Sequence, residues 1–287
     1  MEIRPAFESE LRDIFRNVHE VWPHSDDIES HIQARSASQQ HKYAKWYLVK
    51  DGSQVVASLG AYPYRFQVKD ILVPGIAIGA VHTLESHRRK GLAARLIDYV
   101  HQEEMSLGAK VSMLYSDIAP SYYEKLGYRI QESFHGFVDS KDHPFLSVKE
   151  DSLDKFPSNQ LSGDEAGVAH GKTHWEWLKR RHPSMKHLVV YHGNLPWIQA
   201  LYGYYEGKEM ILDWTVSNPV NDRLTSQGFE SVAAYLNMEK IYLWSRGNVS
   251  SQGFQFQKPE VEIPMVNFLD KSLENQVNWQ FQPIDHV

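Results

Sequence analysis

The residues with the clearest chemical potential are three consecutive basic side chains directly before a glycine. The segment VHTLESHRRKGLAARLIDYV begins at residue 81 and contains, in order, Arg88, Arg89, Lys90, Gly91 and Ala93. The first turn of a helix has unpaired backbone N–H groups and the positive end of the helix dipole, and small residues let the backbone approach an anion closely. The spacing R-x-x-G-x-A therefore predicts a loop that binds a pyrophosphate. Taken alone, the motif is also typical of an ordinary basic helix start.

A second motif lies downstream, in the segment LYSDIAPSYYEKLGYR (residues 114–129). It ends in Tyr123, Gly127 and Tyr128 at the spacing Y-x-x-x-G-Y. The first motif follows an apolar run rich in Ile and Val, which predicts a buried strand, and it opens a helical pattern that Gly108 ends. A strand and a helix are thus expected to hold the basic loop between them, with the tyrosine motif following the next strand.

The elements that must position these motifs follow from apolar periodicity and turn residues. The expected strands of the first half are 2–5, 46–49, 55–62, 71–84, 110–115 and a strand from 128 onward, and the expected helices are 7–21, one from 26 onward, 89–107 and 120–126. Asp51-Gly52 predicts the turn of a hairpin. The first half is therefore expected to be a β-rich meander followed by a βαβαβ segment.

The second half repeats part of this outline. YLVKDGSQVVASLGAY (47–62) and LVVYHGNLPWIQALYGY (188–204) share a strand–turn–strand plan, and each is followed by a further strand and then a helix. This indicates a tandem repeat of one α/β fold with a degenerate second copy; two unrelated α+β segments that merely look alike are the equally weighted alternative. Residues 141–165 are polar and contain Pro144, Pro157 and Gly163, which predicts a linker or an irregular excursion.

Together, the two motifs and their spacing resemble the GNAT superfamily of acyl-CoA-dependent N-acetyltransferases. The resemblance covers residues 1–138 and fades after about residue 140. It implies an α/β fold with a mixed sheet, a GNAT acyltransferase domain in residues 1–140, and a second GNAT-like α/β domain in residues 166–287 that shapes the acceptor pocket. Residues 217–229 lack the basic loop, so no second CoA site is expected there.

The resemblance also implies a set of residues that hold the co-substrate, acetyl-CoA. Val81 and Thr83 would hydrogen-bond the pantetheine arm through their backbone groups, and the loop would cradle the pyrophosphate mainly with backbone N–H groups. The expected acetyl-CoA-binding residues are Val81, His82, Thr83, Arg88, Arg89, Lys90, Gly91, Leu92 and Ala93.

Tyr123 matches the family's tyrosine that protonates the departing CoA thiolate, and a phenol with a pKa of about 10 is a competent donor to a thiolate as it forms. Tyr122 is the alternative for this role. The alternative interpretation of Tyr123 is a helix tyrosine that packs on the core without a catalytic role. The chain has no cysteine, so transfer to the amine is expected to be direct rather than through a cysteine intermediate.

The general base is left open by the sequence. Histone-type members of the superfamily carry a glutamate in the middle of the strand before the loop, and here that position is Ile78. The remaining candidates are Glu85, Asp117 and His82, acting directly or through water. A non-catalytic acyl-CoA sensor or interaction module is therefore kept as the alternative function.

The acceptor is expected to be a primary amine, with a small molecule favoured over a protein. The second motif resembles that of enhanced-intracellular-survival-type aminoglycoside acetyltransferases, whose C-terminal carboxylate reaches the active site, as Val287 could here; it equally resembles fungal lysine acetyltransferases. A net charge of −6 mildly favours a cationic acceptor.

Composition excludes several other functions. The net negative charge argues against a nucleic-acid partner. No apolar run is long enough for a membrane helix and no signal peptide is evident, so a cytoplasmic protein is expected. His170 and His174 have metal-ligand spacing, but Gly171 stands where the zinc hydrolase motif needs glutamate, so no metal is assigned. The oligomeric state and the preferred acyl group stay open.

Overall fold

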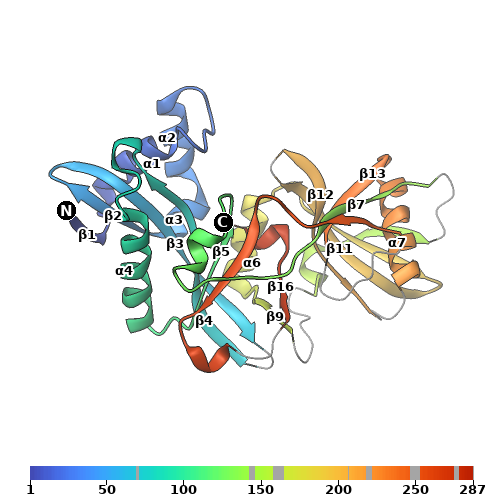
Figure 1. Cartoon of the computed structure of the whole chain (residues 1–287). Coiled ribbons are helices and arrows are strands. Elements are labelled where there is room, and N and C mark those ends of the chain that lie inside the picture. Colours follow the sequence, from blue (N-terminus) through green and yellow to red (C-terminus); the bar gives the residue numbers. More distant parts are fainter. Residues whose placement is uncertain are drawn as a thin grey trace. The chain divides into compact units, whose positions relative to one another are not determined.

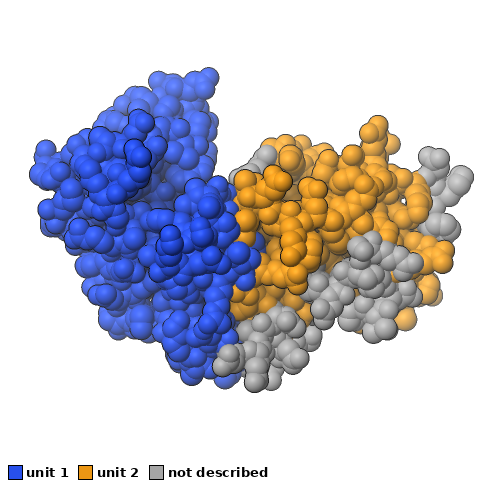
Figure 2. All heavy atoms as spheres, viewed as in Figure 1, with its two compact units in different colours: residues 1–130, 264–275, 287 blue, residues 131–263, 276–286 orange. Residues whose placement is uncertain are grey.

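The chain folds into two compact units, shown in different colours in Figure 2. In this computed structural model, the described residues are 1–68, 71–141, 146–157, 165–205, 207–217, 222–245, 253–274 and 278–286. Unit 1 comprises residues 1–130, 264–275 and 287, and unit 2 comprises residues 131–263 and 276–286. Each unit has its own mixed sheet and helices, which confirms the predicted α/β class.

Unit 1 is built on a mixed sheet with the strand order β1-β2-β3-β4-β5-β15-β6. Figure 1 labels its first five strands, β1 to β5. The strands of unit 1 are β1 (Glu2–Pro5), β2 (Lys45–Asp51), β3 (Gln54–Val68), β4 (Ile71–Thr83), β5 (Val111–Ser116), β6 (Arg129–Ile130) and β15 (Ile263–Phe268). The first four strands pair antiparallel, whereas β4 and β5 pair parallel. A parallel pair needs a crossover, and a helix supplies it here.

The helices of unit 1 are α1 (Leu11–Val18), α2 (Ile28–Ala37), α3 (Gln39–Tyr43), α4 (Leu92–Ser106) and α5 (Ser121–Glu124), with short 3₁₀ turns η1 (Glu8–Glu10), η2 (Glu85–His87) and η4 (Lys271–Leu273). Helices α1, α3 and α4 pack against this sheet, whereas α2 packs against α1 and α3. The crossover helix α4 buries Leu92, Leu96, Ile97 and Val100 and packs on β2, β3 and β4. Burying each such side chain contributes roughly 1.5–3 kcal/mol, which fixes the start of α4 on the sheet.

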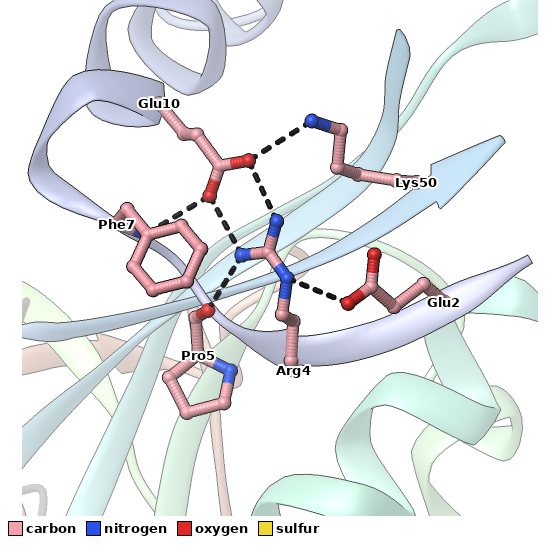
Figure 3. A network of polar contacts seen from close by, with 6 residues as sticks. All are labelled: Glu2, Arg4, Pro5, Phe7, Glu10 and Lys50. Atoms are coloured by element: carbon pink, nitrogen blue, oxygen red, sulfur yellow. Dashed lines mark hydrogen bonds and ion pairs between the residues drawn. The ribbon is translucent and has the colours of Figure 1, made fainter. Parts of the chain in front are cut away.

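A buried carboxylate ties the edge strand β1 to the start of α1 (Figure 3). Glu10 accepts hydrogen bonds from Arg4 Nη1 at 2.7 Å and Nη2 at 2.8 Å, from the Phe7 backbone N–H at 2.9 Å and from Lys50 Nζ at 3.0 Å. The Arg4 hydrogen bond is the main cause that lowers the pKa of Glu10 to about 2. The bidentate pair therefore holds the chain entry to α1 in one orientation.

Unit 2 has a second sheet with the order β14-β7-β13-β12-β11-β10-β8. Its strands are β7 (His135–Asp139), β8 (Ser147–Asp151), β10 (Lys186–His192), β11 (Leu195–Tyr205), β12 (Lys208–Val216), β13 (Lys240–Trp244) and β14 (Gln255–Gln257). The short strands β9 (Glu165–Val168) and β16 (Asn278–Gln280) pair parallel with each other and are not strands of this sheet. The helices of unit 2 are α6 (Lys172–Arg181) and α7 (Asp222–Tyr235), with η3 (Leu153–Lys155) and η5 (Pro283–Asp285). Trp214 and Phe229 meet edge to face at 5.2 Å in its core.

The order of elements in unit 2 repeats that of unit 1. The antiparallel strands β2, β3 and β4 correspond to β10, β11 and β12, each set is followed by a helix, and the next strand pairs parallel in both cases. This is the outline on which the tandem-repeat expectation rests.

Two segments differ from the sequence-based expectation. Residues 141–165, expected to be a linker or an irregular excursion, contain β8, which pairs with β10 over five residues. Because β8 is an edge strand with mostly exposed polar side chains, it lacks the apolar alternation that would have revealed it. Residues 264–275, expected in the second domain, belong to unit 1, because β15 pairs with β6. Residues 142–145 and 158–164 lie outside the described residues.

Within the described ranges, the structure has no helix that is both long and apolar enough to cross a membrane.

Candidate active site

A β-bulge near the end of β4 shapes the candidate site in unit 1. Ser58 of β3 pairs with His82 and Gly60 pairs with Gly79, which leaves Ala80 and Val81 opposite a single residue of β3. Ala80 has a φ of 50°, in the left-handed region that non-glycine residues seldom adopt. Bulges of this kind bend a strand and re-aim its side chains and backbone groups, and they are common beside active sites.

The strands β4 and β5 pair over a short stretch only. Their parallel register joins Gly75–Ala77 to residues 111–113, yet β4 continues to Thr83 and β5 to Ser116. Within the described residues, the last part of β4 therefore has no register partner in β5. Backbone groups of Val81 and Thr83 lie on this part of the strand, where an extended ligand could hydrogen-bond to them.

The basic loop after β4 leads into the first turn of α4. Arg89 has a φ of 61° and Gly91, the N-cap of α4, a φ of 73°. A Cβ placed on Gly91 would meet no atom within 4 Å, so the glycine is needed for its backbone conformation and the space beside it is open. Arg89 and Lys90 are exposed, whereas Leu92 is buried and anchors the helix start. This geometry suits an anion at the first turn of α4.

Arg88 is held differently from its two basic neighbours. Its Nε donates to the Thr83 carbonyl at 3.0 Å, and its Nη2 lies 2.6 Å from Glu20 Oε1. The same oxygen of Glu20 lies 2.7 Å from His82 Nε2. The hydrogen bond to His82 is the main cause that lowers the pKa of Glu20, and Arg88 acts in the same direction. The sequence contains no motif around Glu20 that points to this role.

Tyr123 lies in the short helix α5 and is 7% exposed. Burial is the main cause that raises the pKa of its phenol well above the usual value, and Tyr122 and Asp117 add to the effect. The Tyr123 ring meets the ring of Tyr122 edge to face at 5.1 Å and that of Tyr128 at 6.0 Å. At neutral pH the phenol therefore carries its proton.

Tyr122 connects the two sequence motifs in space. Its hydroxyl accepts a hydrogen bond from the backbone N–H of Ala94, in the first turn of α4. Burial raises the pKa of Tyr122 as well, and this hydrogen bond opposes the rise. The structure thus brings the tyrosine motif against the helix start that carries the basic loop, although the two motifs are separated by α4 and β5 in the sequence.

A buried polar cluster surrounds the hydroxyl of Tyr128, whose ring contacts that of Tyr123. The Tyr128 hydroxyl lies 2.6 Å from Ser112 Oγ on β5 and 3.0 Å from His101 Nε2 on α4. Burial lowers the pKa of His101 to about 4 and raises the pKa of Tyr128 above its usual value. Sequence reasoning missed Ser112 and His101, because single polar residues in apolar segments carry no distinctive spacing.

The other expected base candidates lie at the surface. Glu85 begins η2 and Asp117 follows β5, and both are exposed, whereas Ile78 is buried in β4 at 2% exposure. His82 is the one candidate of the three that is buried, at 3% exposure. In the described part of the chain, no group of three or more histidine or acidic residues could hold a metal ion.

Comparison with known proteins agrees with the family resemblance of the two sequence motifs. Residues 2–131 match the family model of the acetyltransferase (GNAT) domain. A search of curated proteins found no match. The fold is similar to that of a probable N-acyltransferase of unknown function from Enterococcus faecalis V583, at 13% identity and a TM-score of 0.71, with coverage of 95% of this chain and 73% of that one.

Two further solved structures share the fold. A GCN5-related N-acetyltransferase from Anabaena variabilis matches at 15% identity and a TM-score of 0.69, over 95% of this chain and 74% of that one. Eis1 from Mycobacterium abscessus matches at 13% identity and a TM-score of 0.61, over 94% of this chain and 74% of that one. At such identities the likeness concerns the fold, and it extends over both units. The match to the acetyltransferase (GNAT) family model covers residues 2–131, the part of the chain that carries both sequence motifs.

Proposed function

We propose that this protein transfers an acetyl group from acetyl-CoA directly to a primary amine, and that this acceptor is a small cationic molecule rather than a protein. The observation that carries the proposal is the end of β4, which extends beyond its register with β5 and leads into the basic loop at the start of α4. The Ala94 backbone N–H that acts on the Tyr122 hydroxyl links the tyrosine motif to the same helix start. A proton donor and an anion-binding turn then lie beside the unpaired end of β4. These are the parts that acyl transfer from a CoA thioester requires.

The residues around the loop fit the shape and charge of acetyl-CoA. The open space beside Gly91 leaves room for a pyrophosphate against the first-turn N–H groups of α4, and the exposed Arg89 and Lys90 add positive charge. The backbone of Val81 and Thr83 would bind the pantetheine arm. The co-substrate supplies the thioester, and the protein supplies orientation and proton transfer.

In this mechanism the neutral amine attacks the thioester carbonyl while backbone N–H groups of β4 polarise its oxygen. Tyr123 then gives its proton to the departing thiolate. A phenol with a raised pKa is a weaker acid than usual, but burial also raises the basicity of a thiolate, so the two groups stay matched. Burial of Tyr123 thus keeps the donor protonated without removing it from the reaction.

A panel assay tests this function. Acetyl-CoA turnover is followed by free-thiol release against amino acids, polyamines, aminoglycosides, arylamines and lysine peptides, and acetyl-CoA binding is measured by calorimetry on the same protein. Acceptor-dependent thiol release supports the proposal and names the acceptor class. Binding of acetyl-CoA without release by any amine contradicts it.

The second candidate function is a non-catalytic acyl-CoA sensor or interaction module. The buried Ile78, at the position where histone-type members carry glutamate, is the observation that favours it. This candidate predicts acetyl-CoA binding with no thiol release across the whole panel. The same two measurements therefore separate the two functions.

A further inference from the structure

We propose that His82 is the general base of the transfer and that Glu20 is the positioning residue that holds and polarises it. The inference rests on the proposed function and deepens it, because it names the group that takes the proton from a cationic acceptor. It is carried by a buried imidazole–carboxylate pair at the end of β4, beside the bulge.

The first observation is the geometry of the pair. His82 stands between Val81 and Thr83, its side chain is 2% exposed, and its Nε2 lies 2.7 Å from Glu20 Oε1. Glu20 comes from the segment after α1, and 45% of its side chain is exposed. An imidazole whose one nitrogen is held by a carboxylate has its other nitrogen left as a proton acceptor, which is the tautomer that a base requires.

The second observation is a pair of buried polar atoms without a protein partner. Ser58 of β3 is the register partner of His82, so the two side chains lie next to each other on one face of the sheet. Within the described residues, neither His82 Nδ1 nor Ser58 Oγ has a hydrogen-bond partner in the protein, and both atoms are buried. Because buried polar atoms are nearly always paired, this place suits a water molecule or the N–H of an acceptor amine.

The third observation is the charge around the pair. Glu20, from the segment after α1, is the charged group that contacts His82. A second charged group, Arg88 from the loop before α4, contacts Glu20: its Nη2 lies 2.6 Å from Glu20 Oε1. The register neighbour on β3, Ser58, is neutral. The hydrogen bond with His82 is the main cause that lowers the pKa of Glu20, and Arg88 adds to it, so the carboxylate stays ionised and stabilises the imidazolium that forms when His82 takes a proton.

The two other candidates lack these properties. The carboxylates of Glu85 and Asp117 are exposed, so water hydrates them and competes with an acceptor. Neither stands on β4 between the two residues whose backbone is expected to bind the pantetheine arm. His82 is thus the candidate that the fold places nearest to the expected position of the thioester.

The protons balance as follows. The acceptor ammonium loses one proton to His82, directly or through one water, and the neutral amine forms the C–N bond at the thioester carbonyl. The C–S bond breaks and the thiolate takes the Tyr123 proton. The nitrogen then carries two protons and a positive charge, and it gives one of them to the phenolate, which leaves the neutral amide and restores Tyr123. His82 then releases its proton to solvent. The products are the acetylated amine, CoA and one proton.

The test compares acceptors that differ in whether they need a base. The best alkylamine of the panel is protonated at neutral pH, whereas hydroxylamine is neutral. In His82→Gln we expect kcat/KM for the alkylamine to fall ~100-fold or more, since general-base catalysis contributes about 10²–10⁴-fold. For hydroxylamine, kcat/KM should stay within about threefold of wild type, which also shows that the variant is folded. Acetyl-CoA affinity should stay in the same range, because the substitution changes the His82 side chain and keeps the backbone of β4 that is expected to bind the pantetheine arm.

A second variant keeps the imidazole and removes the carboxylate. In Glu20→Gln the imidazolium loses its stabilising partner, so the acid limb of the alkylamine pH–rate profile should move to lower pH. The control is Asp51→Asn, which removes the carboxylate 3.5 Å from His87 in the same unit and should leave the limb in place. An NMR titration of the His82 ring in the acetyl-CoA complex gives the same shift without turnover.

Several outcomes overturn the assignment. Equal losses for the alkylamine and hydroxylamine mean that His82 is structural, and no loss for either means that another group is the base. An acid limb that Glu20→Gln leaves unmoved removes Glu20 from the proposal. If both variants keep wild-type turnover, the roles of His82 and Glu20 are wrong and the proposed function stands. If the wild-type protein binds acetyl-CoA but acetylates neither the alkylamine nor hydroxylamine, the proposed function is wrong as well.

Discussion

At the scale of single residues, Tyr123 and Tyr122 differ although they are adjacent in the sequence. Tyr123 is 7% exposed with its pKa raised mainly by burial, whereas the Tyr122 hydroxyl is hydrogen-bonded by Ala94. We expect Tyr123→Phe to lower kcat ~100-fold or more while acetyl-CoA affinity stays within about twofold, because only the proton donor is lost. Steady-state kinetics with calorimetry of acetyl-CoA binding measures both.

Tyr122→Phe is the matched control for this prediction. The substitution removes the α5 hydroxyl on which the Ala94 N–H of the first turn of α4 acts. It should therefore change acetyl-CoA affinity more than kcat. The reverse pattern, a large kcat loss in Tyr122→Phe and a small one in Tyr123→Phe, would assign the acid to Tyr122. An ordinary tyrosine loses its proton near pH 10. Because the pKa of Tyr123 is raised, wild-type kcat should stay constant through about pH 10 and not decline there.

Gly91 gives a second prediction at this scale. Its φ of 73° is costly for a β-branched residue, by roughly 1–3 kcal/mol, although a Cβ there would meet no neighbour within 4 Å. In Gly91→Val the loop should rearrange and acetyl-CoA affinity should fall by at least ~10-fold. Calorimetry measures the affinity, and retained affinity means that this loop is not the phosphate site.

Gly52 supplies the control for that substitution. It has a φ of 59° and equally open surroundings, but it lies in the turn between β2 and β3. Gly52→Val should therefore cost a similar amount of stability and leave acetyl-CoA affinity unchanged. The pair separates backbone strain as such from strain at the proposed binding loop.

At the scale of elements, the sequence predicted what depends on local pattern. The apolar run 71–84 and the helix 89–107 correspond to β4 and α4 within a few residues, because burial on one face leaves a readable periodicity. The basic loop between them was located for the same reason. The bulge at Ala80 was not, since a two-for-one register depends on the opposing strand as well as on the residues themselves.

Contacts between distant segments could not be predicted in this way. Glu20 belongs to no motif, and its role follows only from its contact with His82, 62 positions away in the chain. The Ser112–Tyr128 pair likewise joins residues that have no patterned spacing. Much of the candidate site is therefore set by strand order and side-chain packing, which a single sequence does not display.

The corresponding strands β4 of unit 1 and β12 of unit 2 differ at their carboxyl ends. In unit 2, β12 also has a register shift, between Leu201 and Tyr202 of its partner β11, and its parallel register with β13 is a single pair. Here Trp214 is fully buried and its Nε1 donates to the Trp244 carbonyl at 2.9 Å. The indole thus bridges the two strands at a place that corresponds to the unpaired end of β4 in unit 1.

A binding stoichiometry follows from this difference. Because Trp214 of β12 is hydrogen-bonded to the Trp244 carbonyl of β13 and residues 217–229 have no basic loop, we expect each chain to bind one acetyl-CoA. Calorimetry should give a stoichiometry of one for the wild type, and Gly91→Val should remove that single event. Two binding events per chain, or one that survives in Gly91→Val, would place a site in unit 2.

At the scale of the whole molecule, both units bury histidines in their uncharged form. Burial lowers the pKa of His101 to about 4 in unit 1, and in unit 2 it lowers the pKa of His135 and His182 to about 4 and that of His286 to about 3. These imidazoles, buried at His101 and His182 and half-buried at His135 and His286, bind protons less readily than the same groups in the unfolded chain, whose ordinary pKa is 6.5. Folding therefore opposes protonation at each of these sites.

This makes stability fall on acidification. The contribution of neutral histidines is fully present above a pH of about 6.5 and is lost as the pH falls toward their lowered values, because the unfolded chain then binds more protons. Each site should cost roughly 1–2 kcal/mol of unfolding free energy by about pH 5. Denaturant unfolding at about pH 7.5 and about pH 5 should show this loss as a lower midpoint at the acidic pH.

Variants locate the effect in particular residues. In His101→Gln the buried group no longer titrates, so the loss of stability between the two pH values should shrink, even though the hydrogen bond to Tyr128 is disturbed and the variant is less stable at both. His192→Gln, at an exposed position at the end of β10, should leave the loss unchanged. Equal midpoints of the wild type at both pH values would mean that the histidines are protonated in the folded chain, and the buried sites would then have to be hydrated.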